Sequence, residues 1–423
     1  MNFRARALDR HGVEQAADWL AVAVAASLPW STSATGILVA LWLLAVLPTL
    51  DFAALRRELE TAAGGLPVLL WALAAVGMLW ADASWSERFG GFSSFNRLLV
   101  IPLLLAQFRR SERAMWVFTA FLASVTAVLV LSWAIVLFPA LPWHASAYGV
   151  PTKDYVLQSG EFLLCAFVLF AVASDNYRVG QWRLAAGFLA LAGFFLANIA
   201  FVVTARTTLL VAPAMTLLFG WRQFRWLGLL AALVLFCILG AAAIFESPQL
   251  HARLDASVTE FRDYEASNAV SSTSMHLEFI RKSLSFVKTA PIIGHGTGSI
   301  PEEFRKSAVG ETRVAAVPAL NPHNQILAVA IQLGLVGAAV LVAMWIAHFM
   351  LFRDAELTAW IGMMVVTQNV VGSLVNSHLF DFTQAWLYIF GVGVAGGVAQ
   401  QKHGSNPPIV LAGKAGAAAG WSP

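Results

Sequence analysis

The sequence predicts an all-α polytopic membrane protein of about twelve transmembrane helices, with one large helical loop outside the membrane. Of its 423 residues, 59% are hydrophobic and only 12% are charged, which is about half of the charged share that is typical of soluble domains. Mean hydropathy is +0.70. A soluble enzyme of this size would need more charge on its surface, and a disordered chain would be less apolar. The composition therefore excludes disorder and argues against a soluble enzyme.

The predicted spans follow from apolar runs that are long enough to cross the hydrocarbon core as helices. In chain order they lie near 15–30, 33–50, 65–81, 96–108, 115–138, 158–174, 184–203, 207–221, 227–245, 323–350, 357–376 and 383–400. The first run is expected to be a span rather than a signal peptide, because Glu14 and Asp18 interrupt its positive flank and no clear cleavage site follows.

The distribution of lysine and arginine predicts the orientation. Fifteen of these residues lie at the chain ends and in every second loop, whereas four lie in the alternate short loops: Arg88, Arg97, Lys153 and Arg206. Positive residues collect in short cytoplasmic loops. Both termini are therefore expected in the cytoplasm, and the number of spans is expected to be even.

The chain divides into four predicted parts: transmembrane helices over 1–245, an external loop domain over 246–322, further transmembrane helices over 323–400 and a cytoplasmic tail over 401–423. In the loop, an early helix is expected at about 250–266. A second, amphipathic helix is indicated by the spacing of Leu277, Ile280, Leu284 and Val287, and Pro291 and the following glycines end it. The tail, rich in Gly, Ala and Pro, is expected to be disordered.

Two arginines on the external side are candidate anion sites. Arg206 stands between two apolar runs with almost no loop to solvate it, and Arg281 lies one turn beyond Leu277, on or near the apolar face, whereas Lys282 is expected to face solvent. A guanidinium can hold phosphate oxygens with a forked pair of hydrogen bonds. The simpler alternatives are a snorkelling side chain for Arg206 and a salt bridge at the edge of the face for Arg281.

The segment Gly294-His295-Gly296 belongs to a glycine-rich stretch whose successive amides could form an anion-binding nest. A plain turn is the alternative. The stretch lacks the Gly-Lys-Ser/Thr end of a phosphate loop.

Pro322-His323-Asn324 is the most informative local pattern. Pro322 predicts the entry to a helix, so His323 is expected in the first turn of a span at the external surface. A helix N-terminus favours nearby anions and a neutral imidazole, and a neutral imidazole is what a general base requires. An interfacial histidine without a role is the alternative.

Other polar residues stand out less. Asp381, in the loop before the last span, could orient a histidine, accept from a substrate hydroxyl or anchor the interface. Arg88 could guide an anionic substrate. Glu161, Gln368 and Asn369 are expected to be structural.

The two cysteines lie in apolar runs and indicate neither a disulfide nor a metal cluster. No nucleotide fingerprint or zinc motif is present, so neither a cofactor nor a metal is expected.

With these motifs the chain resembles the O-antigen ligase and O-antigen polymerase superfamily of bacterial inner membranes. Arg281 through Pro291 and Gly294-His295-Gly296 resembles the family's arginine, spacer and Pro-x-x-Gly-x-Gly segment. Pro322-His323-Asn324 with Leu327 resembles its histidine-asparagine motif. The stretch from 204 to 207 resembles its arginine after the seventh span more loosely, since Ala205 stands where the family more often has serine.

The resemblance implies a glycosyltransferase of the GT-C type whose active site faces the periplasm. It implies that the enzyme transfers O-antigen from undecaprenyl pyrophosphate to a sugar hydroxyl of lipid A–core oligosaccharide, by an inverting and metal-independent mechanism. His323 would be the general base, and Arg206 and Arg281 would bind the pyrophosphate. Substrate contacts are further expected from Arg88, Gly294, His295, Gly296, Asn324 and Asp381.

Three alternatives stay open. An O-antigen polymerase resembles chains with two large loops rather than one, and protein O-oligosaccharyltransferases tend to be longer. A transporter would be expected to show inverted repeats and polar sites at the membrane midplane.

Overall fold

The computed structural model describes residues 3–143, 145–203, 205–246, 252, 255–256, 258–262, 270–354 and 356–405. These residues form helices and their connections, and none of them belongs to a strand longer than the isolated bridge Ala147–Val150. The prediction of an all-α protein is confirmed for this part of the chain.

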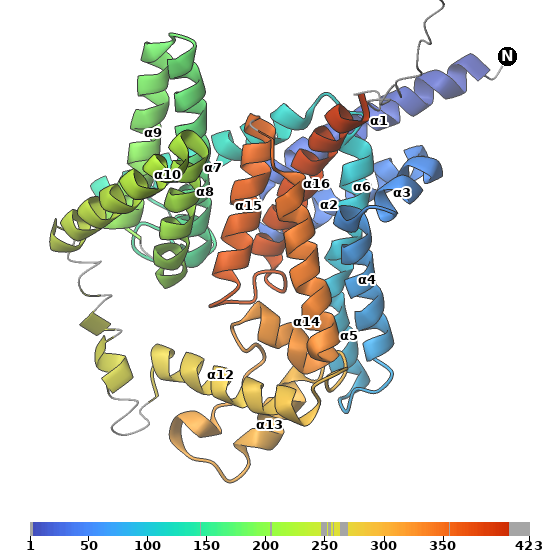
Figure 1. Cartoon of the computed structure of the whole chain (residues 1–423), viewed down its shortest axis with the longest axis vertical. Coiled ribbons are helices and arrows are strands. Elements are labelled where there is room, and N and C mark those ends of the chain that lie inside the picture. Colours follow the sequence, from blue (N-terminus) through green and yellow to red (C-terminus); the bar gives the residue numbers. More distant parts are fainter. Residues whose placement is uncertain are drawn as a thin grey trace, which may run out of the picture.

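Most of the helices form a bundle, and α12 and α13 lie across one end of it (Figure 1). They are α1 Phe3–Ser27, α2 Thr32–Val46, η1 Leu47–Thr49, α3 Phe52–Leu59, α4 Ala62–Gly77, α5 Trp85–Asn96, η2 Arg97–Leu99, α6 Val100–Phe108, α7 Ala114–Leu137, α8 Tyr155–Arg178, α9 Trp182–Phe201, α10 Arg206–Glu246, α12 Ser272–Thr289, α13 Ile300–Ala308, η3 Arg313–Ala316, α14 Gln325–Leu351, α15 Leu357–Gly372 and α16 Phe382–Ser405.

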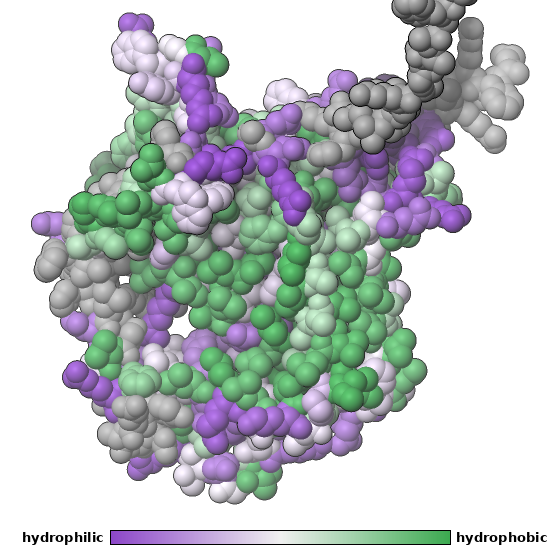
Figure 2. Space-filling model, viewed as in Figure 1, coloured by the Kyte–Doolittle hydropathy of each residue, from purple (hydrophilic) through white to green (hydrophobic). Residues whose placement is uncertain are grey.

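The protein is a multi-pass helical membrane protein. Among the described residues, seven helices are long and apolar enough to cross a membrane, or up to eight if the pair α3 and α4, bent by 84°, is one span. Figure 2 shows a hydrophobic band across the middle of the molecule, with hydrophilic residues gathered towards both ends. The count of about twelve spans stays a prediction, because α1, α10 and α15 match predicted spans without meeting this criterion.

The predicted spans 207–221 and 227–245 are not separated by a loop. They form one helix of 41 residues, α10, because the residues between them include neither Gly nor Pro to end it. The backbone φ angle of Arg225 is +54°, and α10 changes direction along its length (Figure 1).

Small residues and a few buried hydrogen bonds hold the bundle together. A Cβ atom on Gly393 or Gly397 of α16 would lie within 2.8 Å of atoms of α6 or the residue after it, which is the close approach that small residues permit between membrane helices. The buried imidazole of His348 on α14 bonds the Tyr388 hydroxyl of α16 at 2.6 Å and the Ala63 carbonyl of α4 at 2.9 Å. These hydrogen bonds join α4, α14 and α16, and the glycine contacts add α6.

Helix α12 lies across one end of the bundle with α13 beside it, and we call this end the loop end (Figure 1). The predicted amphipathic helix is confirmed there. Of the earlier helix expected at about 250–266, residues 252, 255–256 and 258–262 are helical, and the remainder lies outside the described residues. So does the tail from 406 onwards.

The buried face of α12 differs from the predicted one. Phe279 and Phe286 pack edge-on against Phe304 of α13, with ring centroids 5.4 and 5.2 Å apart. Leu284 is 48% exposed. Because these phenylalanines turn the helix, Lys282 is buried rather than solvated, and its ammonium group donates to the carbonyls of Ser307 and Ala315.

The end of the bundle opposite the loop end contains a buried ion pair. Glu58 on α3 has no exposed side-chain surface, and Arg109 Nη1 lies 2.7 Å from its Oε1. We expect Arg109→Leu to lower the free energy of unfolding in detergent by about 3 kcal/mol, because a buried carboxylate would lose its partner. Chemical unfolding followed by tryptophan fluorescence measures this.

The matched control is Arg56→Leu, also on α3. Arg56 pairs with Glu60 where both side chains are largely exposed, so we expect no measurable change. Equal losses for both variants would contradict the role given to the buried pair.

Candidate functional site at the loop end

His323 lies immediately before α14 rather than in its first turn. The helix begins at Gln325, because Asn324 is the N-cap and its Oδ1 accepts from Leu327 N at 3.0 Å. His323 has a φ of +54°, a conformation that is unusual for a residue with a side chain and that needs support from its surroundings.

That support comes from a set of hydrogen bonds between residues 321–325 and the turn at 373–379, which we call the clasp. Asn321 Oδ1 accepts from His323 N at 2.9 Å and from Ser377 Oγ at 2.6 Å. Asn324 Nδ2 donates to Leu374 O at 2.9 Å. Both ends of the Asn324 amide are therefore engaged by protein, so it positions the turn instead of presenting a free amide to substrate.

Gln325 completes the clasp. Its backbone N donates to Ser373 O at 2.9 Å, and its side-chain Oε1 accepts from Leu379 N at the same distance. The start of α14 is thus fastened on two sides to the connection between α15 and α16, so the imidazole is held by elements that are distant in the sequence.

The clasp also orients the imidazole. His323 Nδ1 faces the Asn376 Oδ1 at 3.4 Å. Because a carboxamide oxygen only accepts, this contact favours a proton on Nδ1 and leaves the lone pair on Nε2. The sequence expectation was that Asp381 could orient a histidine; Asn376 stands in that position instead.

Two residues of α12 pack against the same ring. The ring centroid of His276 lies 4.7 Å from that of His323, and Phe279 stacks on it at 6.2 Å with an interplanar angle of 14°. His276 and Phe279 are three residues apart and so share a face of α12. Sequence reasoning missed His276, since a single histidine on an amphipathic helix carries little signal.

Arg206 begins α10 at the same end and is held by a carboxylate. Its guanidinium reaches both oxygens of Glu260 at 3.2–3.5 Å and Thr273 Oγ1 at 3.0 Å. Glu260 Oε2 also accepts from the Thr273 hydroxyl and amide. The Thr273 hydroxyl, with Arg206 nearby, holds the pKa of Glu260 below its usual value. Arg206 therefore already binds both oxygens of an anionic group, the Glu260 carboxylate.

His276 connects the two predicted residues in space. Its ring contacts that of His323, and Thr273, which bonds Arg206, lies one turn before it on α12. The structure thus brings Arg206 and His323 to the same end of α12.

Arg281 points elsewhere. It is paired with Glu278 through Nε at 2.8 Å and through Nη2, and its side chain is 63% exposed. Five positions separate it from His276, which turns the helix by about 140°. The expected burial near the apolar face is wrong: Lys282 takes the buried position because the two phenylalanines set the rotation of the helix.

The glycine-rich segment forms a turn inserted into a break in α14 at Gly334. Gly294, Gly296 and Gly298 have φ values of +70°, +91° and +88°, and a Cβ on Gly296 would lie 2.4 Å from the Ala81 backbone. The amides of His295 and Gly296 donate to the carbonyls of Ile331 and Gln332 at 2.8 and 2.9 Å. These amides are therefore not free to form an anion nest, and the turn alternative accounts for the segment.

The other three predicted contacts are held by local structure. His295 Nε2 bonds the Phe286 carbonyl at 2.9 Å and so ties α12 to the turn. Arg88 donates to the carbonyls of Ala83 and Met78, each at 2.9 Å. Asp381 Oδ1 accepts from Gln384 N at 3.1 Å and caps α16.

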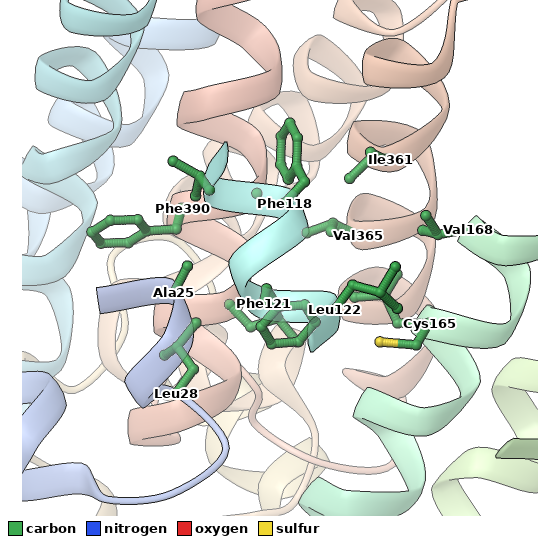
Figure 3. A pocket seen from close by; sticks show the side chains of 14 residues that line it. Ala25, Leu28, Phe118, Phe121, Leu122, Cys165, Val168, Ile361, Val365 and Phe390 are labelled. Carbon is green, nitrogen blue, oxygen red and sulfur yellow. The ribbon is translucent and has the colours of Figure 1, made fainter. Parts of the chain in front are cut away.

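Two cavities lie away from this site. One, of about 50 Å³, is lined by apolar side chains that include Phe118, Phe121 and Cys165 (Figure 3). It offers no group for acid–base chemistry, in keeping with Cys165 as an apolar core residue. The other, of about 450 Å³, lies at the opposite end, where Asp18 is bonded by Gln107, Ser111 and Arg113.

The pairing of the histidines predicts a dependence of stability on pH. Burial, together with the neighbouring His323 and Arg206, lowers the pKa of His276 to about 4. An unfolded histidine titrates near 6.5, so the unfolded state binds more protons between these values and stability falls as pH drops through this window. We expect His276→Phe to reduce the loss of unfolding temperature between pH 7 and pH 5.

The control is His11→Phe, which changes an exposed histidine bonded to Gln15 at the opposite end. It should leave the pH dependence as in the parent protein. The same pH dependence for His276→Phe and the parent protein would show that His276 titrates normally.

Residues 190–342, roughly a third of the chain, match a family model described as O-antigen ligase. This segment contains Arg206, Arg281 and His323. No curated protein matches the chain. The matched segment begins in α9 and ends within α14, so it covers α12 and the start of α14, where Arg206 and His323 come together around His276. Over this segment the chain is similar to the O-antigen ligase family, and the similarity supports assigning it there.

Proposed function

We propose that the protein is an O-antigen ligase of the Gram-negative inner membrane. It transfers O-antigen from undecaprenyl pyrophosphate to a sugar hydroxyl of lipid A–core oligosaccharide at the periplasmic face, with a GT-C architecture and both termini in the cytoplasm. The observation that carries the proposal is the convergence of His323 and Arg206 at the loop end, within the segment that matches the family. A base and an anion site are the two groups that this transfer needs.

His323 acts as the general base. Asn376 accepts from Nδ1–H, which leaves the Nε2 lone pair for the proton of the acceptor hydroxyl. As that proton passes to Nε2, the hydroxyl oxygen bonds to the anomeric carbon and the bond from this carbon to the pyrophosphate oxygen breaks. Attack from the side opposite the leaving group inverts the anomeric configuration.

Arg206 stabilises the pyrophosphate as it leaves. The guanidinium now holds the two oxygens of Glu260, and two phosphate oxygens present the same forked arrangement. Donor binding therefore exchanges Glu260 for phosphate at this arginine. The fixed positive charge at the leaving group takes the part that a divalent cation plays in other transferases.

Arg281 is proposed as a second phosphate contact, made from the exposed side of α12. Its guanidinium is likewise held in a fork, by Glu278, and two phosphate oxygens present the same forked arrangement. Arg88 and Asp381 support the substrate path by holding the ends of α4 and α16 in place.

The cellular test is deletion of the gene, followed by gel analysis of lipopolysaccharide. A ligase predicts loss of all attached O-antigen and accumulation of the lipid-linked polymer. A single attached repeat unit would instead identify a polymerase, and an unchanged ladder would contradict both.

The base is tested by His323→Asn. Asparagine tolerates a positive φ and keeps a polar side chain, so we expect the unfolding temperature to stay close to that of the parent protein. Turnover should fall by about 10²–10⁴-fold, the usual contribution of a general base. An assay of glycan transfer from the purified lipid-linked donor gives kcat and KM. Turnover near that of the parent protein would contradict the role of His323 as the base.

The anion site is tested by Arg206→Gln. We expect the KM for the lipid-linked donor to rise and turnover to fall, because the pyrophosphate loses a fixed positive charge. Activity of the parent protein should persist in EDTA. Arg305→Gln is the control, since Arg305 lies at the same end but pairs with Glu87 and Glu302. Strict dependence on added divalent metal would contradict the role of the arginine.

A further inference from the structure

A small polar cavity lies within the bundle, where α8, α10, α15 and α16 meet. Two carboxamides and an imidazole line it, those of Gln368, Gln384 and His378, each no more than 5% exposed. The rest of its wall is formed by Val156, Gly160, Leu163, Thr207, Thr208 and Val211. Among the residues that the structure describes, the cavity is lined by no charged side chain, so it is suited to a neutral polar group.

Two of these side chains, Gln368 and His378, lack hydrogen-bond partners within the part of the chain that the structure describes. Both amide atoms of Gln368 and both ring nitrogens of His378 are buried and unpaired. Burial lowers the pKa of His378 to about 4, which leaves a neutral ring with one donor and one acceptor. Buried polar groups in proteins are almost always satisfied, so such a group of unpaired atoms indicates an occupant that supplies the partners.

The surrounding backbone makes room for these side chains. A Cβ on Gly160 of α8 would lie 3.0 Å from Gln368 Nε2 and 3.4 Å from Gln384 Nε2. A Cβ on Gly372 would lie 2.2 Å from Cε1 of His378. Both glycines stand where a larger residue would displace a polar group from its position, so the cavity is built around these side chains.

The cavity lies between the two halves of the proposed catalytic site. Thr207 and Thr208 belong to the first turn of α10, directly after Arg206. His378 follows Asn376 and Ser377, which contact His323 and Asn321 in the clasp. A donor whose pyrophosphate is held by Arg206 would therefore place its first sugar beside the cavity.

We propose that this cavity binds one neutral hydrogen-bonding substituent, a hydroxyl group, of the sugar that is joined to the pyrophosphate. This inference rests on the proposed function. The cavity volume of about 10 Å³ admits a single small group rather than a sugar ring. Carboxamides and a neutral imidazole can each donate and accept, which is the chemistry that recognises such a substituent.

The test compares two probes, undecaprenyl pyrophosphate and the same lipid carrying one O-antigen repeat unit, bound to the purified full-length protein. The parent protein should bind the sugar-bearing probe more tightly. Gln368→Leu should lower the affinity for that probe by about tenfold or more, since the sugar substituent loses a hydrogen-bonding partner in the cavity. It should leave the affinity for undecaprenyl pyrophosphate unchanged.

Two variants serve as controls. Thr367→Val changes the neighbouring residue on α15, whose hydroxyl bonds the Met363 carbonyl of its own helix, and should bind both probes as the parent protein does. Arg206→Gln should weaken both probes, because it acts on the pyrophosphate. Arg206→Gln could leave the binding of both probes unchanged while Gln368→Leu still removes the preference for the sugar-bearing probe. That result would contradict the proposed function and support the proposed role of the cavity.

Stability provides a further readout. Without ligand, Gln368→Leu should unfold at the same or a higher temperature than the parent protein, because it removes an unpaired buried amide. A lower unfolding temperature with unchanged affinity for both probes would overturn the proposal and make Gln368 a structural residue. Unchanged stability and unchanged affinities would mean that the cavity holds water, which also overturns it. If Gln368→Leu does not fold, Gln384→Leu is the second variant, and it should likewise weaken binding of the sugar-bearing probe and leave binding of undecaprenyl pyrophosphate unchanged.

Discussion

The clasp between residues 321–325 and 373–379 is the constraint on which the candidate site depends. It holds His323 at a φ of +54°, a conformation that the residue would not keep alone. It also sets Asn376 against one ring nitrogen and so decides which nitrogen is free. Ser377 and His378 belong to the same turn. The clasp therefore places the cavity, with its unpaired polar atoms, next to the proposed base His323.

Helix α12 brings the second half of the site to the first. Its start bonds Arg206 and Glu260 through Thr273, and one turn later His276 meets His323. The helix is held in this rotation by the packing of Phe279 and Phe286 on α13 and by the buried ammonium of Lys282. A local change in that packing would therefore move the arginine site relative to the base, although neither residue belongs to it.

Much of the fold could be predicted from the sequence, because a bilayer imposes strong conditions on composition and on the length of apolar runs. Helices form at each predicted span, and α12 ends before the glycines as expected. The errors lie where local sequence is ambiguous. The residues between 221 and 227 contain no helix breaker, so α10 continues. Likewise, α12 has two adjacent apolar stripes, and periodicity alone did not show that Phe279 and Phe286, rather than Leu277 and Leu284, would be buried.

The sequence by itself determined the membrane class, the order of the helices and the positions of Arg206 and His323 as unusual polar residues near span ends, since charge beside a bilayer is costly and therefore conspicuous. The tertiary structure decided their partners. Glu260, His276 and Asn376 reach these residues from segments 47 to 54 positions away along the chain, and such pairings follow from how helices rotate and pack. The cavity at Gln368 and His378 was decided in the same way, because each residue alone resembles a structural polar group and only their convergence leaves atoms without partners.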